Sequence, residues 1–271
     1  MTAPAAGRIP LRGTAPTDQG VAARVIWLEQ AATATSTVLP STSPISVFVN
    51  RDHRGHREGR GYAQTKLYGF GESRSFRCLW ALEEAGLPYE YISTKLRTDA
   101  ADPASAQHPG YLQLNVQGKV PTLHNDGLVL TESIAILHYI ARCAPESGLL
   151  PNASMDVYAR LDELTSFVLA ELEQPLWSKG KHTFALPAEQ RVPQMLETAK
   201  FEFKKAVTTL DHMLPESEFA VADSFTLVDI LLAQTFNWAI RFQFEVPARF
   251  VTLRDRHYKR PAAQRALNVA G

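Results

Sequence analysis

The sequence predicts an α/β domain followed by an all-α domain, and two observations carry this prediction. Between residues 66 and 143, short β-prone runs alternate with segments whose apolar residues recur at helical spacing, in the order β-α-β and then β-β-α. After a linker with two prolines and a glycine, strand signals almost vanish and long amphipathic patterns follow. We therefore expect domains at residues 66–144 and 153–271, joined by a linker at 145–152.

The first β-α-β unit is indicated by an apolar run at residues 66–70, helical spacing at 73–86 that ends in a glycine, and a β-prone run at 88–94. Two strands joined through a helix pair in parallel by a right-handed crossover. We expect this pairing between the two runs.

A hairpin and a helix complete the α/β part. Asp126-Gly127 lies between β-prone runs at 119–123 and 128–130, and an Asp-Gly step of this kind is a strong hairpin signal. An apolar helix face then begins at Ser133.

The second half contains long amphipathic patterns at residues 155–177 and 192–214. A further, almost wholly apolar helix begins after Thr226. We expect Thr226 to accept a hydrogen bond from the amide of Asp229, whose carboxylate returns a bond to the amide of Thr226. Such a cap contributes about 1 kcal/mol.

Composition excludes several classes of protein. The 28 basic and 28 acidic residues of the 271-residue chain cancel, so no long-range field attracts nucleic acid or an anionic membrane. The two cysteines cannot form a disulfide scaffold or a zinc set, and they fit a reducing compartment, so we expect a cytoplasmic protein. The most apolar stretch, at 227–240, is too short and too polar to span a membrane. The histidines show no metal spacing, and no metal is expected.

Residues 1–65 differ in composition from the rest of the chain. They are rich in Pro, Thr, Ser and Ala, and all seven of their basic residues are Arg. We interpret them as disordered or as a spurious extension. A functional tail, a targeting leader and a start codon assigned too far upstream all remain open.

Four motifs of the folded part resemble the cytosolic glutathione transferase superfamily. They are Lys-Val-Pro-Thr-Leu at 119–123, Thr-Glu-Ser-Ile-Ala-Ile at 131–136, Thr-Leu-Val-Asp at 226–229 and Arg-Pro-Ala at 260–262. The resemblance implies a thioredoxin-like domain followed by a helical bundle. It also implies detoxification chemistry, in which glutathione is a substrate conjugated to a small hydrophobic electrophile, and a homodimer.

The residue types of two motifs suit glutathione. A cis proline at Pro121 would leave the backbone of Val120 free to pair with an extended peptide. Glu132 supplies a charge for an α-amino group, while Ser133 and the helix start favour a carboxylate. Lys119 is a candidate for the glycyl carboxylate or another peptide oxygen. A plain turn, a helix cap and an exposed Lys are the structural alternatives.

The catalytic group is expected to be a serine hydroxyl. A free thiol is mostly protonated at neutral pH, so catalysis needs a donor that favours the thiolate, and a helix N-terminus assists it. Ser73 lies four residues before Arg77 and matches the activating serine of theta- and phi-like transferases. Ser75 is the rival. Either serine could instead be structural.

For the hydrophobic substrate, Leu172 and Trp177 are candidates, although core packing is an alternative for both. Gln107 and His108 are weaker candidates for the glycyl carboxylate, where the family's basic residue has no clear match. The alternatives for function are another glutathione-dependent reaction (ether or halide cleavage, isomerisation or peroxide reduction) and a non-catalytic binding module.

Overall fold

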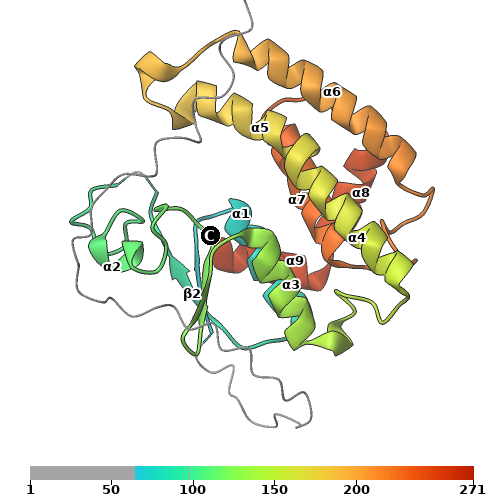
Figure 1. Ribbon diagram of the computed structural model, residues 1–271, viewed down its shortest axis with the longest axis horizontal. Helices are drawn as coiled ribbons and strands as arrows, with labels where there is room; N and C mark the ends of the chain where they lie inside the picture. Colours follow the sequence, from blue (N-terminus) through green and yellow to red (C-terminus); the bar gives the residue numbers. More distant parts are fainter. Residues whose placement is uncertain (1–64, 97) are drawn as a thin grey trace, which may run out of the picture. The chain divides into compact units, whose positions relative to one another are not determined.

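The computed structural model describes residues 65–96 and 98–271, so the prediction for residues 1–65 lies outside the described residues except at Thr65. The first part of the described chain is an α/β unit (Figure 1). Its elements are β1 (Lys66–Gly69), α1 (Arg74–Ala85), β2 (Glu90–Ser93), α2 (Pro109–Leu112), β3 (Thr122–Asn125), β4 (Leu128–Leu130) and α3 (Ser133–Cys143).

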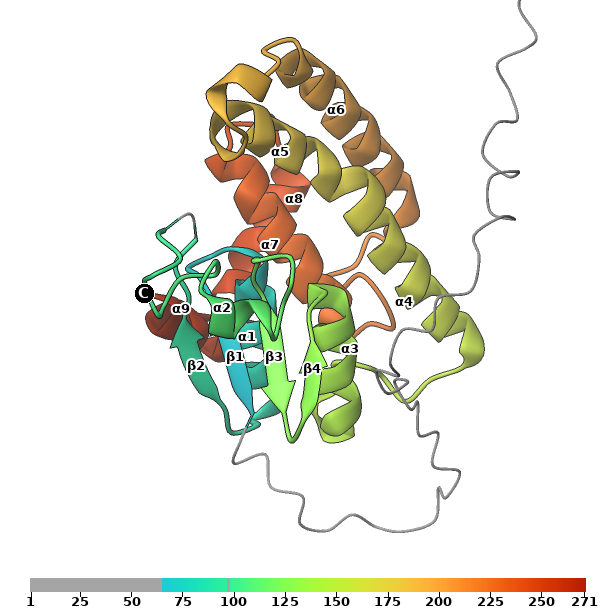
Figure 2. The ribbon, with the colours of Figure 1, turned by 60° about the vertical axis from the view of Figure 1, so that its left-hand side comes forward.

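The four strands form one mixed sheet in the order β2-β1-β3-β4 (Figure 2). β1 pairs with β2 in parallel, as predicted, and the other two pairings are antiparallel. Asp126 and Gly127 both have positive φ angles, 46° and 81°, which confirms the predicted two-residue hairpin between β3 and β4. α1 packs on β1, and α3 packs beside α1.

The second part is helical in the structure. Its helices are α4 (Met155–Phe167), α5 (Glu173–Gly180), α6 (Met195–Met213), α7 (Leu227–Arg241), α8 (Ala248–Tyr258) and α9 (Pro261–Ala270). A π-helical segment, Val168–Leu172, joins α4 to α5, so the predicted helix at 155–177 is one element with an interruption. This architecture confirms the predicted fold class. Within the described residues, no helix is long and apolar enough to cross a membrane.

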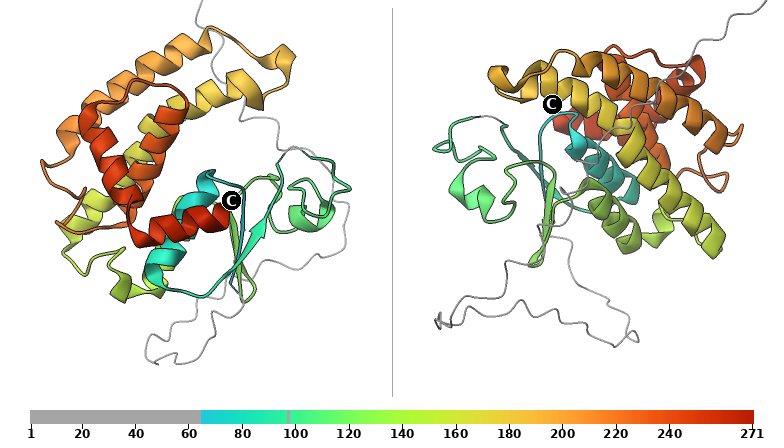
Figure 3. Two further views of the ribbon diagram at one scale, coloured as in Figure 1. Left: turned by 180° about the vertical axis from the view of Figure 1, so that it is seen from behind. Right: turned by 45° about the horizontal axis from the view of Figure 1, so that its top comes forward.

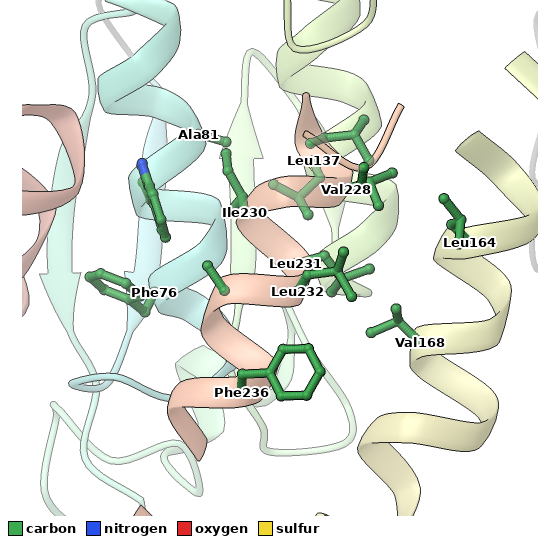
Figure 4. Packing of buried hydrophobic residues seen from close by; sticks show 14 of the residues in the cluster. Phe76, Ala81, Leu137, Leu164, Val168, Val228, Ile230, Leu231, Leu232 and Phe236 are labelled. Carbon is green, nitrogen blue, oxygen red and sulfur yellow. The ribbon is translucent and has the colours of Figure 1, made fainter. Parts of the chain in front are cut away.

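Helix α7 lies at the centre of the hydrophobic core. It packs against α1, α4 and α8, and Figure 4 shows its side chains Ile230 and Phe236 in this core together with Phe76 of α1. The ring of Phe236 stacks on that of Phe250, with centroids 4.5 Å apart. α9 packs along α1, which brings the C-terminal end of the chain beside the first helix (Figure 3). α1 therefore contacts the sheet on one side and the C-terminal helices on the other.

The start of α7 has the predicted capping box. Oδ2 of Asp229 accepts a hydrogen bond from the amide of Thr226 at 2.8 Å, and the Thr226 hydroxyl also accepts from the amide of Val228 at 3.3 Å. The second carboxylate oxygen of Asp229 accepts from the amide of Ala220 at 2.9 Å. Asp229 thus caps the N-terminus of α7 and fixes the preceding loop, although its side chain is fully buried.

Candidate functional site

A pocket with a volume of about 210 Å³ lies where the loop before β3 meets the N-terminal end of α3 and the α4–α5 junction. It brings together the residues for which the sequence predicted glutathione contacts: Lys119, Val120, Pro121, Glu132 and Ser133. Arg74 and Glu173, which the sequence analysis did not assign, also line it. Residues from four separate parts of the chain therefore meet at one site.

The loop before β3 presents the backbone of Val120. The Val120–Pro121 peptide bond is cis. The carbonyl of Lys119 accepts hydrogen bonds from the Tyr111 hydroxyl and from Nδ2 of Asn115, the latter at 2.8 Å. Among the hydrogen bonds of the described residues, none uses the N–H or C=O of Val120. A fixed loop thus leaves one peptide unit able to pair with an extended ligand.

The N-terminal end of α3 forms another wall of the pocket. Glu132 is the N-cap residue, and its exposed side chain makes no capping hydrogen bond. Ser133 follows as the first residue of the helix and is 5% exposed. The free amides of this first turn and the positive end of the helix dipole favour a bound carboxylate.

The two candidate serines occupy different positions at the start of α1. Ser73 is the N-cap and is half-buried, whereas Ser75 is fully buried and does not face solvent. Their hydroxyl oxygens are 2.8 Å apart, and the Ser75 hydroxyl accepts from the amide of Phe70 at 3.0 Å. The amide of Ser75 donates to the Ser73 hydroxyl at 3.3 Å. Of the two serines, only Ser73 therefore has an exposed surface, and Ser75 hydrogen-bonds to it from within the core. Neither serine is among the residues that line the pocket, although Arg74, which follows Ser73, does line it.

Helix α7 holds the turn that carries Ser73. Nε2 of Gln234 donates to the Ser73 carbonyl at 2.8 Å, and Nε1 of Trp238 donates to the Glu72 carbonyl at 2.7 Å. The Glu72 side chain accepts from Asn237 at 2.8 Å and pairs with Arg241 at 2.5 Å. In the sequence Gln234 and Asn237 only interrupted an apolar run. The structure shows that they form a polar stripe that fixes the turn.

A buried ionic cluster lies behind the pocket, and the sequence analysis missed it. Arg77 is fully buried and pairs with Oε2 of Glu173, which is 1% exposed. Nε of Arg74 donates to Oε1 of the same carboxylate at 2.6 Å. Arg77 also donates to Oε1 of Gln234 at 2.6 Å and, over 3.5 Å, to the Ser133 hydroxyl. The only signal in the sequence was an Arg on the apolar face of a helix, whose partner lies 96 residues further along the chain.

The charges of this cluster determine the ionisation of its acid. Burial acts to raise the pKa of Glu173, but the guanidinium groups of Arg77 and Arg74 outweigh it and hold that pKa below its usual value. Glu173 is thus a carboxylate that two cations share. The cluster of three side chains keeps one net positive charge.

The predicted contacts with a hydrophobic substrate need a correction. Leu172 is fully buried in the core, so it has no surface from which to contact a ligand. Trp177 is partly exposed, and its ring lies 5.5 Å from the Arg74 guanidinium. Gln107 and His108 do not line the pocket; Gln107 donates to the Gly118 carbonyl and His108 caps α2. Within the described residues, no group of three or more His, Cys, Asp or Glu side chains could hold a metal ion.

Comparisons with known proteins agree with this architecture. The family model described as "Glutathione S-transferase, N-terminal domain" matches residues 63–142, and "Glutathione S-transferase, C-terminal domain" matches residues 174–263. The chain is 31% identical over 138 residues to glutathione S-transferase GST-4.5 of Xanthomonas campestris pv. campestris, an alignment that covers 51% of this chain and 68% of that protein. It is 29% identical over 192 residues to maleylacetoacetate isomerase of Dictyostelium discoideum, covering 68% and 83% of the two chains.

A similar fold occurs in a solved structure of a sphingomonad glutathione S-transferase complexed with glutathione. The two chains are 28% identical, with a TM-score of 0.64, and the match covers 76% of this chain and 98% of the other.

Proposed function

The chain belongs to the cytosolic glutathione transferase superfamily, and from this premise we propose that it conjugates the thiolate of glutathione to a small hydrophobic electrophile. One observation carries the proposal. The five residues expected from their chemistry to hold glutathione line a single pocket, where the loop before β3 meets the N-terminal end of α3. A homodimer, a cytoplasmic location and a role in detoxification are proposed with it, on family membership.

Glutathione would lie across this pocket as an extended peptide. Its cysteinyl backbone would pair with the free N–H and C=O of Val120 beside Pro121, as an added strand. Its γ-glutamyl end would extend toward α3, where Glu132 binds the amino group and Ser133 with the first-turn amides binds the carboxylate. Lys119, exposed at the edge of the pocket, would bind a peptide oxygen or the glycyl carboxylate.

Ser73 would stabilise the thiolate. Its hydroxyl oxygen is within hydrogen-bonding distance of both the amide and the hydroxyl of Ser75. When Ser75 donates to it, the Ser73 proton is left to point toward the ligand. The amide of Phe70 completes a chain of donors that ends at the sulfur, and such chains strengthen each member. In this scheme Ser73 is the catalytic residue and Ser75 is a positioning residue.

The test is a glutathione titration across pH with the full chain, with bound thiolate followed by ultraviolet absorbance. The wild type should lower the thiol pKa below its free value of about 8.5–9. A hydrogen bond to a charged group contributes about 1.5–3 kcal/mol, so Ser73→Ala should raise the bound thiol pKa by about 1–2 units. Ser75→Ala should raise it less. An equal thiol pKa in the wild type and in Ser73→Ala would refute the role of Ser73.

A second candidate function is glutathione-dependent isomerisation, which the similarity to a maleylacetoacetate isomerase favours. Ether or halide cleavage, peroxide reduction and a non-catalytic binding role share the same glutathione site. These reactions are separated by measuring the turnover of three substrate classes with one preparation of the protein. The classes are aryl halides, cis-unsaturated acids for isomerisation, and hydroperoxides for peroxide reduction. Glutathione binding with an unshifted thiol pKa and no turnover would favour the binding module.

A further inference from the structure

Arg74 is held in one orientation by its surroundings. It is the first residue of α1, and its guanidinium carbon lies 5.5 Å from the ring centroid of Trp177 and 5.4 Å from that of Trp238. Its Nε donates to Oε1 of the buried Glu173. Two indole rings and a carboxylate therefore fix a side chain that would otherwise move freely.

The terminal nitrogens of this fixed guanidinium are unused. Within the described residues, the side chain of Arg74 makes a single hydrogen bond, from Nε to Glu173. Its terminal nitrogens Nη1 and Nη2 therefore have no partner there. The side chain is 28% exposed and lines the candidate pocket. A planar pair of N–H donors at a pocket wall has the geometry that binds a carboxylate through both oxygens.

The charge of Arg74 is also only partly compensated, because Arg74 shares the carboxylate of Glu173 with Arg77. Glu173 is the one carboxylate of the cluster, and the fully buried Arg77 pairs with it as closely as Arg74 does. If the negative charge of Glu173 balances that of Arg77, the positive charge of Arg74 remains unbalanced, on the side of the cluster that lines the pocket. A bound anion would balance it.

We propose that Arg74 binds a carboxylate of the electrophilic substrate through Nη1 and Nη2. The substrate is then an apolar molecule that carries a carboxylate, with Trp177 and Trp238 packing against its apolar part. This inference rests on the proposed function. The γ-glutamyl carboxylate of glutathione is the other possible source of the same chemistry. We favour the electrophile because Arg74 is oriented by α5 and α7 of the helical part, whereas the amides of α3 already suit the γ-glutamyl end.

The probe is a chloronitrobenzoate with its chlorine para to the carboxylate and ortho to the nitro group, compared with its methyl ester. The glutathione sulfur forms a bond to the ring carbon with its own electron pair, and chloride leaves with the electrons of the carbon–chlorine bond. The two probes react by the same chemistry and differ in charge. Binding without glutathione is measured by quenching of tryptophan fluorescence, and kcat/KM is measured with glutathione at saturation.

Arg74→Gln should weaken binding of the acid, and lower its kcat/KM, by about 10- to 100-fold, with the ester changed less than about twofold. Arg74→Lys keeps the charge but loses the paired donors, so its loss should be intermediate. Arg160→Gln, which removes an exposed Arg of α4, is the matched control and should leave both probes unchanged. A cooperative urea transition and an unchanged native circular dichroism spectrum show that each variant is folded.

Two other outcomes overturn the assignment of Arg74, and a third overturns the proposed function instead. If Arg74→Gln weakens glutathione binding while the ratio of acid to ester stays constant, the carboxylate belongs to glutathione. If both probes lose equally with normal glutathione binding, Arg74 is only structural. The third outcome combines binding without turnover. The wild type would bind the acid more tightly than the ester, Arg74→Gln would not, and no conjugate would form from either probe or from an uncharged aryl halide. The carboxylate site would then stand, and the proposed function would fail.

Discussion

Replacing Glu173 by Gln should destabilise the protein strongly, because it leaves a buried cation without its counter-charge. At an effective dielectric constant of about 20, opposite unit charges about 4 Å apart attract by about 4 kcal/mol. Arg77 is 0% exposed, so water cannot replace the lost carboxylate there, whereas Arg74 is 28% exposed and partly screened. The amide of Gln retains one neutral hydrogen bond, which returns about 1 kcal/mol.

We therefore expect a loss of about 3 kcal/mol, a large share of the 5–15 kcal/mol that is typical of folded proteins. Urea unfolding followed by circular dichroism measures it. Glu163→Gln is the matched control, since this exposed acid pairs with the exposed Arg160 and its loss should cost no more than about 1 kcal/mol. Adding Arg77→Met to Glu173→Gln should recover part of the stability, because both buried charges are then gone. Equal losses of stability for Glu173→Gln and Glu163→Gln would show that the buried charge of Arg77 does not depend on Glu173.

Three further predictions follow from the same structure. Nε2 of the buried His257 lies 3.5 Å from Oδ1 of Asp229, and burial raises the pKa of Asp229 to about 6 and lowers that of His257 to about 4. Between these pH values the pair binds one proton in both states, on Asp229 in the folded chain and on His257 in the unfolded chain. Asp229→Asn leaves His257 alone, and the unfolding free energy should then fall by about 1 kcal/mol per unit as the pH drops from 6 toward 4, as urea titrations would show; a slope equal to that of the wild type would contradict this. Trp238→Phe removes the donor to the Glu72 carbonyl. It should raise the thiol pKa of bound glutathione, but by less than Ser73→Ala does. An unchanged thiol pKa in Trp238→Phe would contradict this prediction. Burial raises the pKa of the Cys78 thiol to about 12, so mass spectrometry should find it alkylated in urea and unmodified in the native protein.

Local chemistry explains which parts of the fold could be predicted. The Asp126-Gly127 hairpin and the Thr226–Asp229 cap depend on residues within four positions of each other, and the structure contains both. Five of the residues that line the pocket could also be predicted, because the loop before Pro121 and the start of α3 are encoded by short motifs. Arg74 and Glu173, which line the same pocket, could not.

The rest depends on tertiary packing that periodicity does not report. The partner of Arg77 is 96 residues away, and no pattern in the sequence joins them. Leu172 was wrongly expected at a binding surface because helical spacing identifies an apolar face without saying what covers it. The π-helical segment Val168–Leu172 also changes the angle per residue, so the periodicity before it does not predict which side chains face the pocket after it.

The turn that carries Ser73 is anchored by Gln234, which follows it by 161 residues. During translation the residues that we propose to bind glutathione leave the ribosome first, but α7, which fixes the turn that carries Ser73, leaves it late. Closing so long a loop costs entropy that local contacts cannot offset. A nascent chain that has not yet reached Leu227 thus carries most of the proposed binding groups but lacks the helix that fixes the turn of Ser73. The proposed thiolate chemistry therefore requires that the chain be synthesised through α7, because the core around this helix can form only then.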